Sequence, residues 1–424
     1  PADHHRLTGT CLRTILAAFQ PDLVWVLDHL RREYSTWFPG NLPFVCWIQD
    51  HLPNLGNVEA GRSVGRRDFV LAHLGSAPVY RRLHGYPARQ TIDMPKLTRM
   101  PTLPANWRSD GDGEDMVYVS NWSRTPEQMI DEVLNHYAPP KLRPLTERCC
   151  RRLIEHYEAG GSVATFREAR RLLEPVVDRV APGLDGDARY QAMFPAFDRL
   201  NNCLYRQQAL NWAAEIARSH GLSLGLYGSG WDRHPQLAEF DRGPVEYGEA
   251  LEALTRRAKI NLQIVPYFCF HQRLLDGLAA GGFFLVRHHP ADRLLPRLVR
   301  LIEAGEPLPD DLADEARGLC ELGDQADPVE IVRGYREAGV LLDDGGVLSE
   351  LDEISFTGRE DFERLVLRHL ADEDRRREIA AVQRRSIARR FSYVEGVRRV
   401  TRWMSNLLAE EAAADCEGRA GGHE

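Results

Sequence analysis

The residues best suited to binding an anion lie together in His271-Gln272-Arg273, and a carboxylate, Asp276, follows one turn later. Apolar residues at helical spacing predict a helix over about 271–280, so these polar groups fall on its first turns. The free N–H groups at a helix start favour an anion, and a guanidinium or imidazolium there can hold a diphosphate. The carboxylate could accept the two hydroxyls of a ribose. The alternative is an exposed Arg273–Asp276 ion pair followed by a Gly281-Gly282 helix stop.

A second candidate is the loop Gly228-Ser229-Gly230-Trp231, which directly follows an apolar run. Ligands of open parallel sheets bind beyond the carboxyl ends of the strands. Two glycines at such a place let the backbone approach a ligand closely. A plain glycine turn would explain the same pattern.

Acidic and imidazole side chains follow another apolar run, at Asp50 and His51. Their position at a strand end predicts that they face the side where an acceptor could bind, and either could act as a general base. Asp28-His29 ends the preceding strand in the same way. Helix capping by Asp50 is the alternative interpretation.

Short apolar runs must position these residues. Strands are predicted in the first part of the chain at 22–27, 43–48, 68–73 and 91–94, and in the second part at 116–121, 222–228, 259–265 and 283–287. Continuous apolar runs are typical of parallel strands that are covered on both faces. Helical segments between them predict an α/β fold with two doubly wound sheets.

The segment from 98 to 115 is rich in Pro, Asp and Gly and predicts a linker, while 126–219 has mostly helical periodicity. We therefore predict three parts. They are a Rossmann-like domain over 1–110, shortened at its start, a second Rossmann-like domain over 111–395 with a helical insertion at 126–219, and a closing helix with a frayed tail over 396–424.

Composition narrows the functional classes. The 424 residues are 43% hydrophobic and 27% charged, which is ordinary for a globular protein. A net charge of -8 argues against a nucleic-acid partner. No apolar stretch approaches the roughly 20 residues of a transmembrane helix. Eight cysteines without a CxxC pair favour a reducing, cytoplasmic compartment and predict no metal site.

Five short motifs, taken in order, resemble the C-terminal domain of CgeB-like glycosyltransferases, a branch of the GT-B fold. They are Tyr227-Gly228-Ser229-Gly230-Trp231, the segment 243–249, the segment 258–262, His271-Gln272-Arg273 and the segment 276–283. The similarity covers about 222–405 and is loose over 20–125. One departure is Cys269, seven positions before Asp276, where many retaining enzymes of this fold carry a glutamate.

The resemblance implies two Rossmann-like domains that face each other across a cleft. It implies metal-independent transfer of a sugar from a nucleotide-diphosphate donor, without a cofactor, by a hexosyltransferase-like enzyme of class EC 2.4. Asp276 matches the position that holds the donor ribose, and Arg273 and His271 match positions that contact its phosphates. The residues expected to bind the donor are Gly228, Ser229, Gly230, Trp231, His271, Gln272, Arg273 and Asp276.

The expected partners are a nucleotide sugar and a glycan, protein or small-molecule acceptor, with Asp50 and His51 as the catalytic candidates. Three alternatives remain open. A sugar-nucleotide 2-epimerase would use the same donor site without an acceptor. A non-catalytic descendant would bind a sugar nucleotide or a partner protein. A dinucleotide oxidoreductase fits the sheets less well, since no GxGxxG follows a strand.

Overall fold

The computed structural model describes residues 9–34, 37–50, 52, 54–103, 113–121, 124–266, 269–318 and 327–420. The chain divides into two compact units. The first combines Pro1–Lys96 with Cys320–Val340 and Val394–Glu424, and the second combines Leu97–Leu319 with Leu341–Tyr393. The first unit therefore draws on three separate stretches of sequence, whereas the sequence analysis divided the chain into continuous domains.

The first unit is built on a four-stranded parallel sheet of order β1-β2-β3-β4. Its strands are β1 (Val24–Leu27), β2 (Phe44–Trp47), β3 (Asp68–His73) and β4 (Thr91–Met94). All four lie within or coincide with the predicted apolar runs. The two central strands are buried along almost their whole length, because helices or loops cover both faces, and this explains their unbroken apolar sequence.

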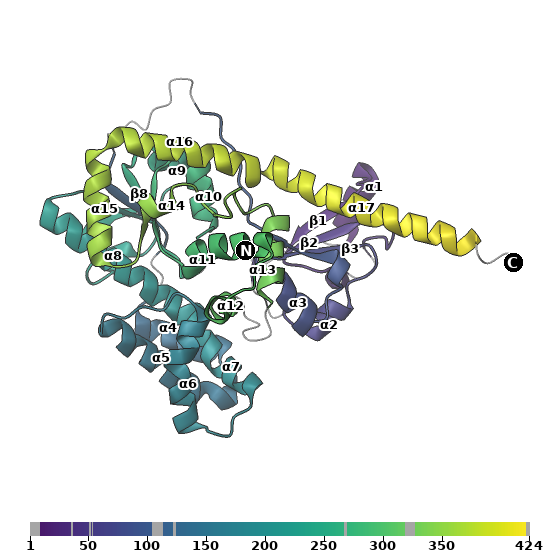
Figure 1. Ribbon diagram of the computed structural model, residues 1–424, viewed down its shortest axis with the longest axis horizontal. Helices are drawn as coiled ribbons and strands as arrows, with labels where there is room; N and C mark the ends of the chain where they lie inside the picture. The colour runs from purple at the N-terminus through teal and green to yellow at the C-terminus, as the bar shows by residue number, and fades with distance from the viewer. Residues whose placement is uncertain are drawn as a thin grey trace. The chain divides into compact units, whose positions relative to one another are not determined.

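Helices flank this sheet (Figure 1). They are α1 (Gly9–Phe19), α2 (Val58–Arg62), α3 (Ala77–Leu83), α13 (Pro328–Glu337) and most of α17 (Tyr393–Ala420). Two of them come from the later stretches. Trp403 of α17 packs edge-to-face on Phe69 of β3, with ring centroids 5.5 Å apart. Gly334 of α13 lies so close to Asp93 that an added Cβ would come within 2.3 Å of its carboxylate.

The second unit contains a six-stranded parallel sheet of order β10-β9-β8-β5-β6-β7. The strands are β5 (Met116–Val119), β6 (Leu224–Tyr227), β7 (Asp241–Gly243), β8 (Ile260–Gln263), β9 (Phe284–Arg287) and β10 (Ser355–Phe356). Four of them match predicted runs. The sequence analysis missed the two edge strands, β7 and β10, which have only three and two residues.

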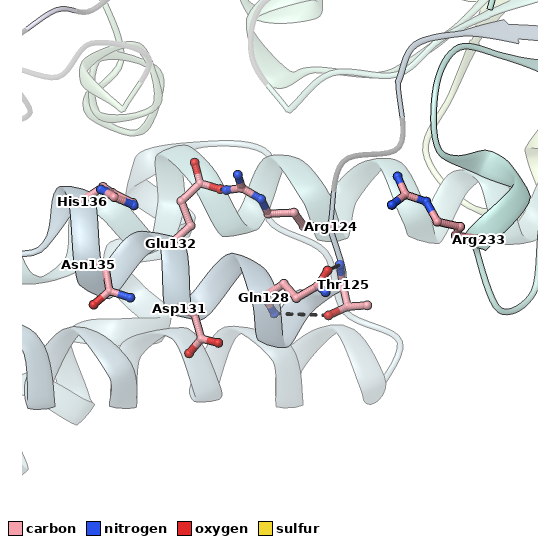
Figure 2. A pocket seen from close by; sticks show the side chains of 8 residues that line it. All are labelled: Arg124, Thr125, Gln128, Asp131, Glu132, Asn135, His136 and Arg233. Atoms are coloured by element: carbon pink, nitrogen blue, oxygen red, sulfur yellow. Dashed lines mark hydrogen bonds and ion pairs between the residues drawn. The ribbon is translucent and has the colours of Figure 1, made fainter. Parts of the chain in front are cut away.

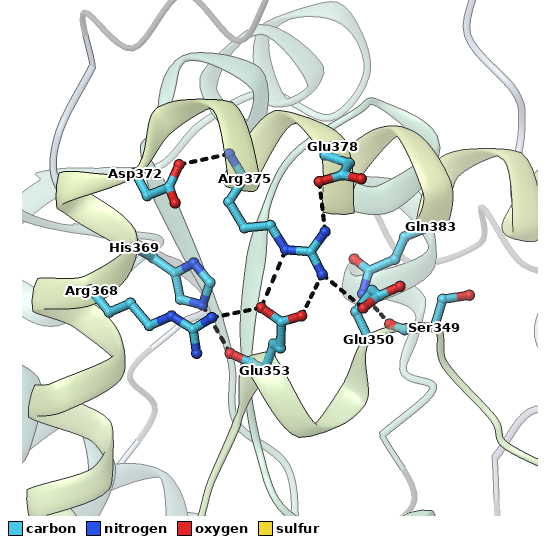
Figure 3. A network of polar contacts seen from close by, with 9 residues as sticks. All are labelled: Ser349, Glu350, Glu353, Arg368, His369, Asp372, Arg375, Glu378 and Gln383. Carbon is cyan, nitrogen blue, oxygen red and sulfur yellow. Dashed lines mark hydrogen bonds and ion pairs between the residues drawn. The ribbon is translucent and has the colours of Figure 1, made fainter.

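Several helices surround this sheet. They are α9 (Glu249–Arg257), α10 (Gln272–Ala279), α11 (Pro290–Ala304), α12 (Asp310–Arg317), α14 (Leu351–Ile354), α15 (Arg359–Ala371) and α16 (Glu373–Arg390). Helix α16 runs alongside α10 (Figure 1). Glu353 of α14 accepts hydrogen bonds from Arg368 of α15 and Arg375 of α16, so one carboxylate ties three helices together (Figure 3).

The predicted helical insertion lies between β5 and β6. It comprises α4 (Pro126–Glu132), the π-helical turn η3 (Val133–Tyr137), α5 (Arg143–Glu158), α6 (Phe166–Val180), α7 (Gly186–Pro195), the π-helical turn η5 (Ala196–Asn201) and α8 (Asn202–His220). These helices enclose a hydrophobic core of their own that includes Cys149, Leu173 and Leu200. The helical character expected for 126–219 is thus confirmed.

The fold is therefore α/β with two parallel sheets, as predicted. Within the described ranges, no helix has both the length and the apolar character needed to cross a membrane.

Candidate functional site

The carboxyl ends of β5 and β6 are tied together at the edge of the second sheet. The backbone N–H of Ser120 donates to the Tyr227 carbonyl at 2.8 Å, and the indole N–H of Trp231 donates to the Ser120 carbonyl at 2.6 Å. The backbone N–H of Ser229 donates to the Asn121 side chain at 2.9 Å. The loop predicted to meet the donor therefore packs directly on the segment that follows β5.

Two glycines of this loop have backbone angles that side chains disfavour. Gly228 has a φ of 140° and Gly230 a φ of 93°. A Cβ at Gly228 would lie 2.4 Å from the Ser120 carbonyl oxygen, closer than any real contact. Gly228 also donates its N–H to the Gly243 carbonyl at 2.9 Å. The glycines are thus explained by the turn itself, and the same turn brings the backbone close to the sheet edge.

Tyr118, at the end of β5, is the centre of this edge. The guanidinium of Arg273 lies over its ring at 4.8 Å from the centroid, and Trp231 contacts the ring edge-to-face at 6.3 Å. Arg206 of α8 donates to the Ser120 hydroxyl at 3.2 Å. Burial alone would raise the pKa of Tyr118, but the charges of Arg273 and Arg206 outweigh it and hold that pKa below its ordinary value.

Arg273 is partly buried, and of the described carboxylates none forms an ion pair with it. A small cavity of about 20 Å³ lies beside Tyr118, and Arg206, Arg124 and Trp231 are among the other residues that line it. A cation held by an aromatic ring and without a carboxylate partner keeps its positive potential for an anionic ligand. This edge is therefore suited to a phosphate group.

Sequence reasoning found Arg273 and the glycine loop but missed Tyr118, Arg206 and Arg124. Tyr118 lies inside an apolar run, where an aromatic residue indicates a core position. Arg206 lies in the middle of a long helix without any motif around it. The pairing of β5 with β6 and with β8 brings the glycine loop and the start of α10 to Tyr118, and α8 places Arg206 beside Ser120.

Helix α10 begins where it was predicted, and its first residue is capped by His271. The imidazole Nδ1 of His271 accepts the backbone N–H of Arg273 at 3.3 Å. The ring therefore takes one of the N–H groups that an anion would otherwise use. Gly281, with a φ of 90°, follows the helix end, so the helix-stop interpretation of the Gly281-Gly282 pair is correct.

Gln272 and Asp276 belong to a second polar group, separate from Tyr118. The Asp276 carboxylate accepts hydrogen bonds from the Thr98 hydroxyl at 2.7 Å and from the Gln272 amide at 2.8 Å. Gln272 also donates to the Leu97 carbonyl at 2.9 Å. The Tyr247 hydroxyl lies 3.4 Å from the other carboxylate oxygen. The alternative Arg273–Asp276 ion pair is absent from this described part of the chain.

The carboxyl edge of the first sheet carries the catalytic candidates. Asp50 is exposed, and its N–H and that of Gln49 donate to the Asp28 carboxylate at 3.1 and 2.6 Å. Asp28 has a φ of 58°, which is uncommon for a residue with a side chain and is often found at functional sites. Asp50 caps no described helix, since the cap of α2 is Asn57. His51 lies outside the described residues.

A histidine–carboxylate pair lies beside Asp28. The Nδ1 of His29 is 2.8 Å from a carboxylate oxygen of Glu33, whose other oxygen accepts the Leu30 N–H at 2.8 Å. When Nδ1 carries the proton toward Glu33, Nε2 is left with a lone pair that can accept a proton. The sequence analysis noted His29 but not Glu33.

No metal centre is formed by the side chains that the structure places: within the described ranges, no group of three or more His, Cys, Asp or Glu residues is arranged to hold an ion.

The fold and this edge define an α/β protein with parallel sheets and a cationic, glycine-lined strand end. Comparison with known proteins adds little to that class. No family model matches the chain, and no curated protein matches it. One solved structure with some likeness is that of a mutant of S. aureus TarM in complex with Fondaparinux, alpha-GlcNAc-glycerol and UDP. The identity is 8% and the TM-score 0.42. The match covers 93% of this chain but only 58% of the TarM chain, so we base the proposal below on this chain's own residues.

Proposed function

We propose that the protein is a glycosyltransferase of the GT-B type that takes a sugar from a nucleotide-diphosphate donor. The observation that supports this most directly is Arg273, held over the Tyr118 ring at 4.8 Å beside the glycine loop. Phosphates bind where backbone and cations meet at the carboxyl end of a parallel sheet. The CgeB-like character rests on the five motifs of residues 227–283 alone, and the two domains facing across a cleft are part of the same proposal.

The donor diphosphate would bind between Arg273, Arg206 and the backbone around Ser229. As the bond between the sugar and the diphosphate breaks, negative charge grows on the leaving diphosphate. Fixed guanidinium groups stabilise this charge without having to move. We therefore propose a transfer that needs no bound metal. Asp276 is the candidate for the donor ribose, but a ligand there must displace or share the hydrogen bonds from Thr98 and Gln272.

On the acceptor side, Asp50 is the proposed base that takes the proton of the acceptor hydroxyl. We also propose that the protein works in the cytoplasm, where its cysteines remain reduced. The cysteines that the structure describes are free thiols, which supports this proposal.

The test is a panel of nucleotide diphosphates, measured first by thermal shift and then by titration calorimetry. A bound nucleotide raises the melting temperature by mass action. Arg273→Ala should weaken the best binder roughly ten- to a hundredfold, because a hydrogen bond to a charged group contributes about 1.5–3 kcal/mol. The matched control is Arg300→Ala on α11, whose exposed side chain donates to the Pro296 carbonyl of its own helix.

Equal nucleotide affinity in the wild type and Arg273→Ala would show that the donor does not bind at this edge. Incubating the wild type with donor sugars in a chelator, with and without candidate acceptors, then separates the activities. Acceptor-dependent transfer or slow donor hydrolysis supports the proposal. Conversion of the donor to an epimer indicates a 2-epimerase, and binding without any turnover indicates a non-catalytic descendant.

A further inference from the structure

A polar pocket of about 660 Å³ lies in the second unit, over the first turns of the helical insertion. Seven of its eight lining residues come from Arg124, Thr125 and the outer face of α4 and η3. The eighth is Arg233, at the end of the short helix η6 (Trp231–Arg233) that follows the glycine loop. Figure 2 shows Arg233 beyond the start of α4, with its guanidinium group on the side that faces Arg124. None of these residues was a candidate in the sequence analysis.

The wall formed by α4 is held firmly. Thr125 and Gln128 form a reciprocal capping box at 3.0 and 3.2 Å, which fixes the first turn of the helix. The opposite face of the helix places Ile130 and Val133 in the core of the insertion. The polar face is therefore presented outward by a helix that cannot easily rotate.

The continuation of α4 is a π-helical turn, η3, closed by a hydrogen bond from the Ala138 N–H to the Val133 carbonyl at 2.8 Å. Asn135 and His136 of this turn line the pocket. Turns of this type are rare, and they occur frequently at functional sites because they redirect side chains out of the α-helical register. The π-helical turn thus supplies two of the polar side chains that line the pocket.

The lining residues indicate the chemistry of a ligand. They offer two guanidinium groups, two carboxylates, two amides, a hydroxyl and an imidazole, and no hydrocarbon side chain. Two formal positive and two formal negative charges balance, and Arg124 is itself paired with Glu132. An apolar ligand would leave these groups unpaired, and an anion would meet Asp131 and Glu132. A neutral ligand rich in hydroxyl groups matches both donors and acceptors.

The pocket borders the proposed donor site. Arg124 lines both this pocket and the small cavity at Tyr118, and Arg233 lies two positions beyond Trp231 in η6. A volume of about 660 Å³ is within the range of roughly 300–1,000 Å³ for small-molecule sites. We infer that the pocket binds a neutral carbohydrate beside the proposed donor site. This inference rests on the proposed glycosyltransferase function.

The test uses the full chain on an array of neutral and charged oligosaccharides of varied composition and linkage, followed by titration of the best neutral binder. A double variant, Asp131→Ala with Asn135→Ala, removes two exposed groups from the pocket wall. The matched control, Glu155→Ala with Glu158→Ala, removes two exposed groups from α5 of the same insertion. Melting temperatures confirm that both variants fold.

We expect the pocket variant to bind the oligosaccharide at least roughly tenfold more weakly, with nucleotide-diphosphate affinity unchanged, while the control keeps both. No binding of any array member by the wild type, or equal binding by the wild type and the pocket variant, overturns the inference. Binding of charged glycans alone also overturns it. If the proposed function itself is wrong, the wild type binds no nucleotide diphosphate. That result differs from a failure of the carbohydrate inference, in which nucleotide binding remains.

Discussion

The carboxyl edges of the two parallel sheets have opposite chemistry. At the edge of the second sheet, Arg273 and Arg206 gather around a buried tyrosine and a glycine loop. At the edge of the first sheet, the side chains are carboxylates and an imidazole, with Asp28, Glu33 and His29 within hydrogen-bonding reach of the surrounding backbone or of each other.

Under the proposed function, the two edges have different tasks. Fixed cations stabilise a phosphate leaving group, whereas carboxylates and imidazole remove protons from hydroxyl groups. Glycosyl transfer needs both. The comparison predicts that substitutions at the first edge change turnover and leave nucleotide affinity alone, and that substitutions at the second edge change nucleotide affinity.

The largest effect should follow Asp50→Asn. The amide cannot accept a proton at neutral pH, so turnover should fall about a hundredfold or more, the range found for a general base. Nucleotide-diphosphate affinity, measured by calorimetry, should stay the same because Asp50 belongs to the other edge. Steady-state transfer assays with saturating donor give the turnover number.

His29 is the alternative base to test if Asp50→Asn keeps its turnover. His29→Gln removes the imidazole that pairs with Glu33 at 2.8 Å and keeps a polar side chain at that position. Full turnover in Asp50→Asn together with a large loss in His29→Gln would refute Asp50 as the base and transfer the role to the His29–Glu33 pair. Reduced nucleotide affinity in either variant would contradict the prediction that the first edge affects turnover alone.

A smaller effect should come from Gly228→Ala at the second edge. The φ of 140° and the carbonyl oxygen of Ser120 at 2.4 Å from an added Cβ require the loop to move away from β5. We expect a loss of about 2 kcal/mol in the free energy of unfolding, together with weaker nucleotide binding. Chemical denaturation measures the first and calorimetry the second.

Gly183→Ala is the matched control, because no atom lies within 4 Å of an added Cβ there. Its stability should stay within about 0.5 kcal/mol of the wild type. Unchanged stability in Gly228→Ala would show that the loop adapts readily, and the close approach of this backbone to the sheet edge would no longer be a constraint on the site.

The sheets could be predicted because their strands are local patterns. The runs at 68–73 and 91–94 are largely apolar and coincide with β3 and β4. By contrast, β10 has two residues and exists only because Ser355 and Phe356 pair with β9, a contact that no local pattern encodes. The helix at 271–280 was also predictable from its apolar spacing.

The site was predicted in part, for the same reason. Arg273 stands in a recognisable motif, but its partner Tyr118 is 155 positions earlier, and Thr98 is 178 positions before Asp276. Such pairs arise from the fold and leave no trace in spacing. Glu33 differs, because it lies four positions after His29, and this spacing could have indicated the pair.

The smallest effect concerns Tyr118 and is a dependence on pH. The pKa of Tyr118 lies below its ordinary value of 10.0, so the phenol ionises at a lower pH than a free tyrosine. The protonated phenol is neutral and leaves the charge of Arg273 available. As pH rises through this pKa, tyrosinate forms, pairs with the arginine and repels a diphosphate. Nucleotide affinity should therefore be roughly fivefold lower at about pH 10 than at neutral pH.

Tyr118→Phe keeps the ring under the guanidinium but removes the ionising hydroxyl. In this variant the alkaline loss of affinity should disappear, while affinity near neutral pH should change by only about 1 kcal/mol or less, because the contact between hydroxyl and guanidinium is long at 3.5 Å. Titrating both proteins with one nucleotide over the same pH range cancels the ionisation of the ligand. If both lose affinity in parallel, Tyr118 does not control the charge of this edge, and the contrast with the carboxylate edge depends on the arginines alone.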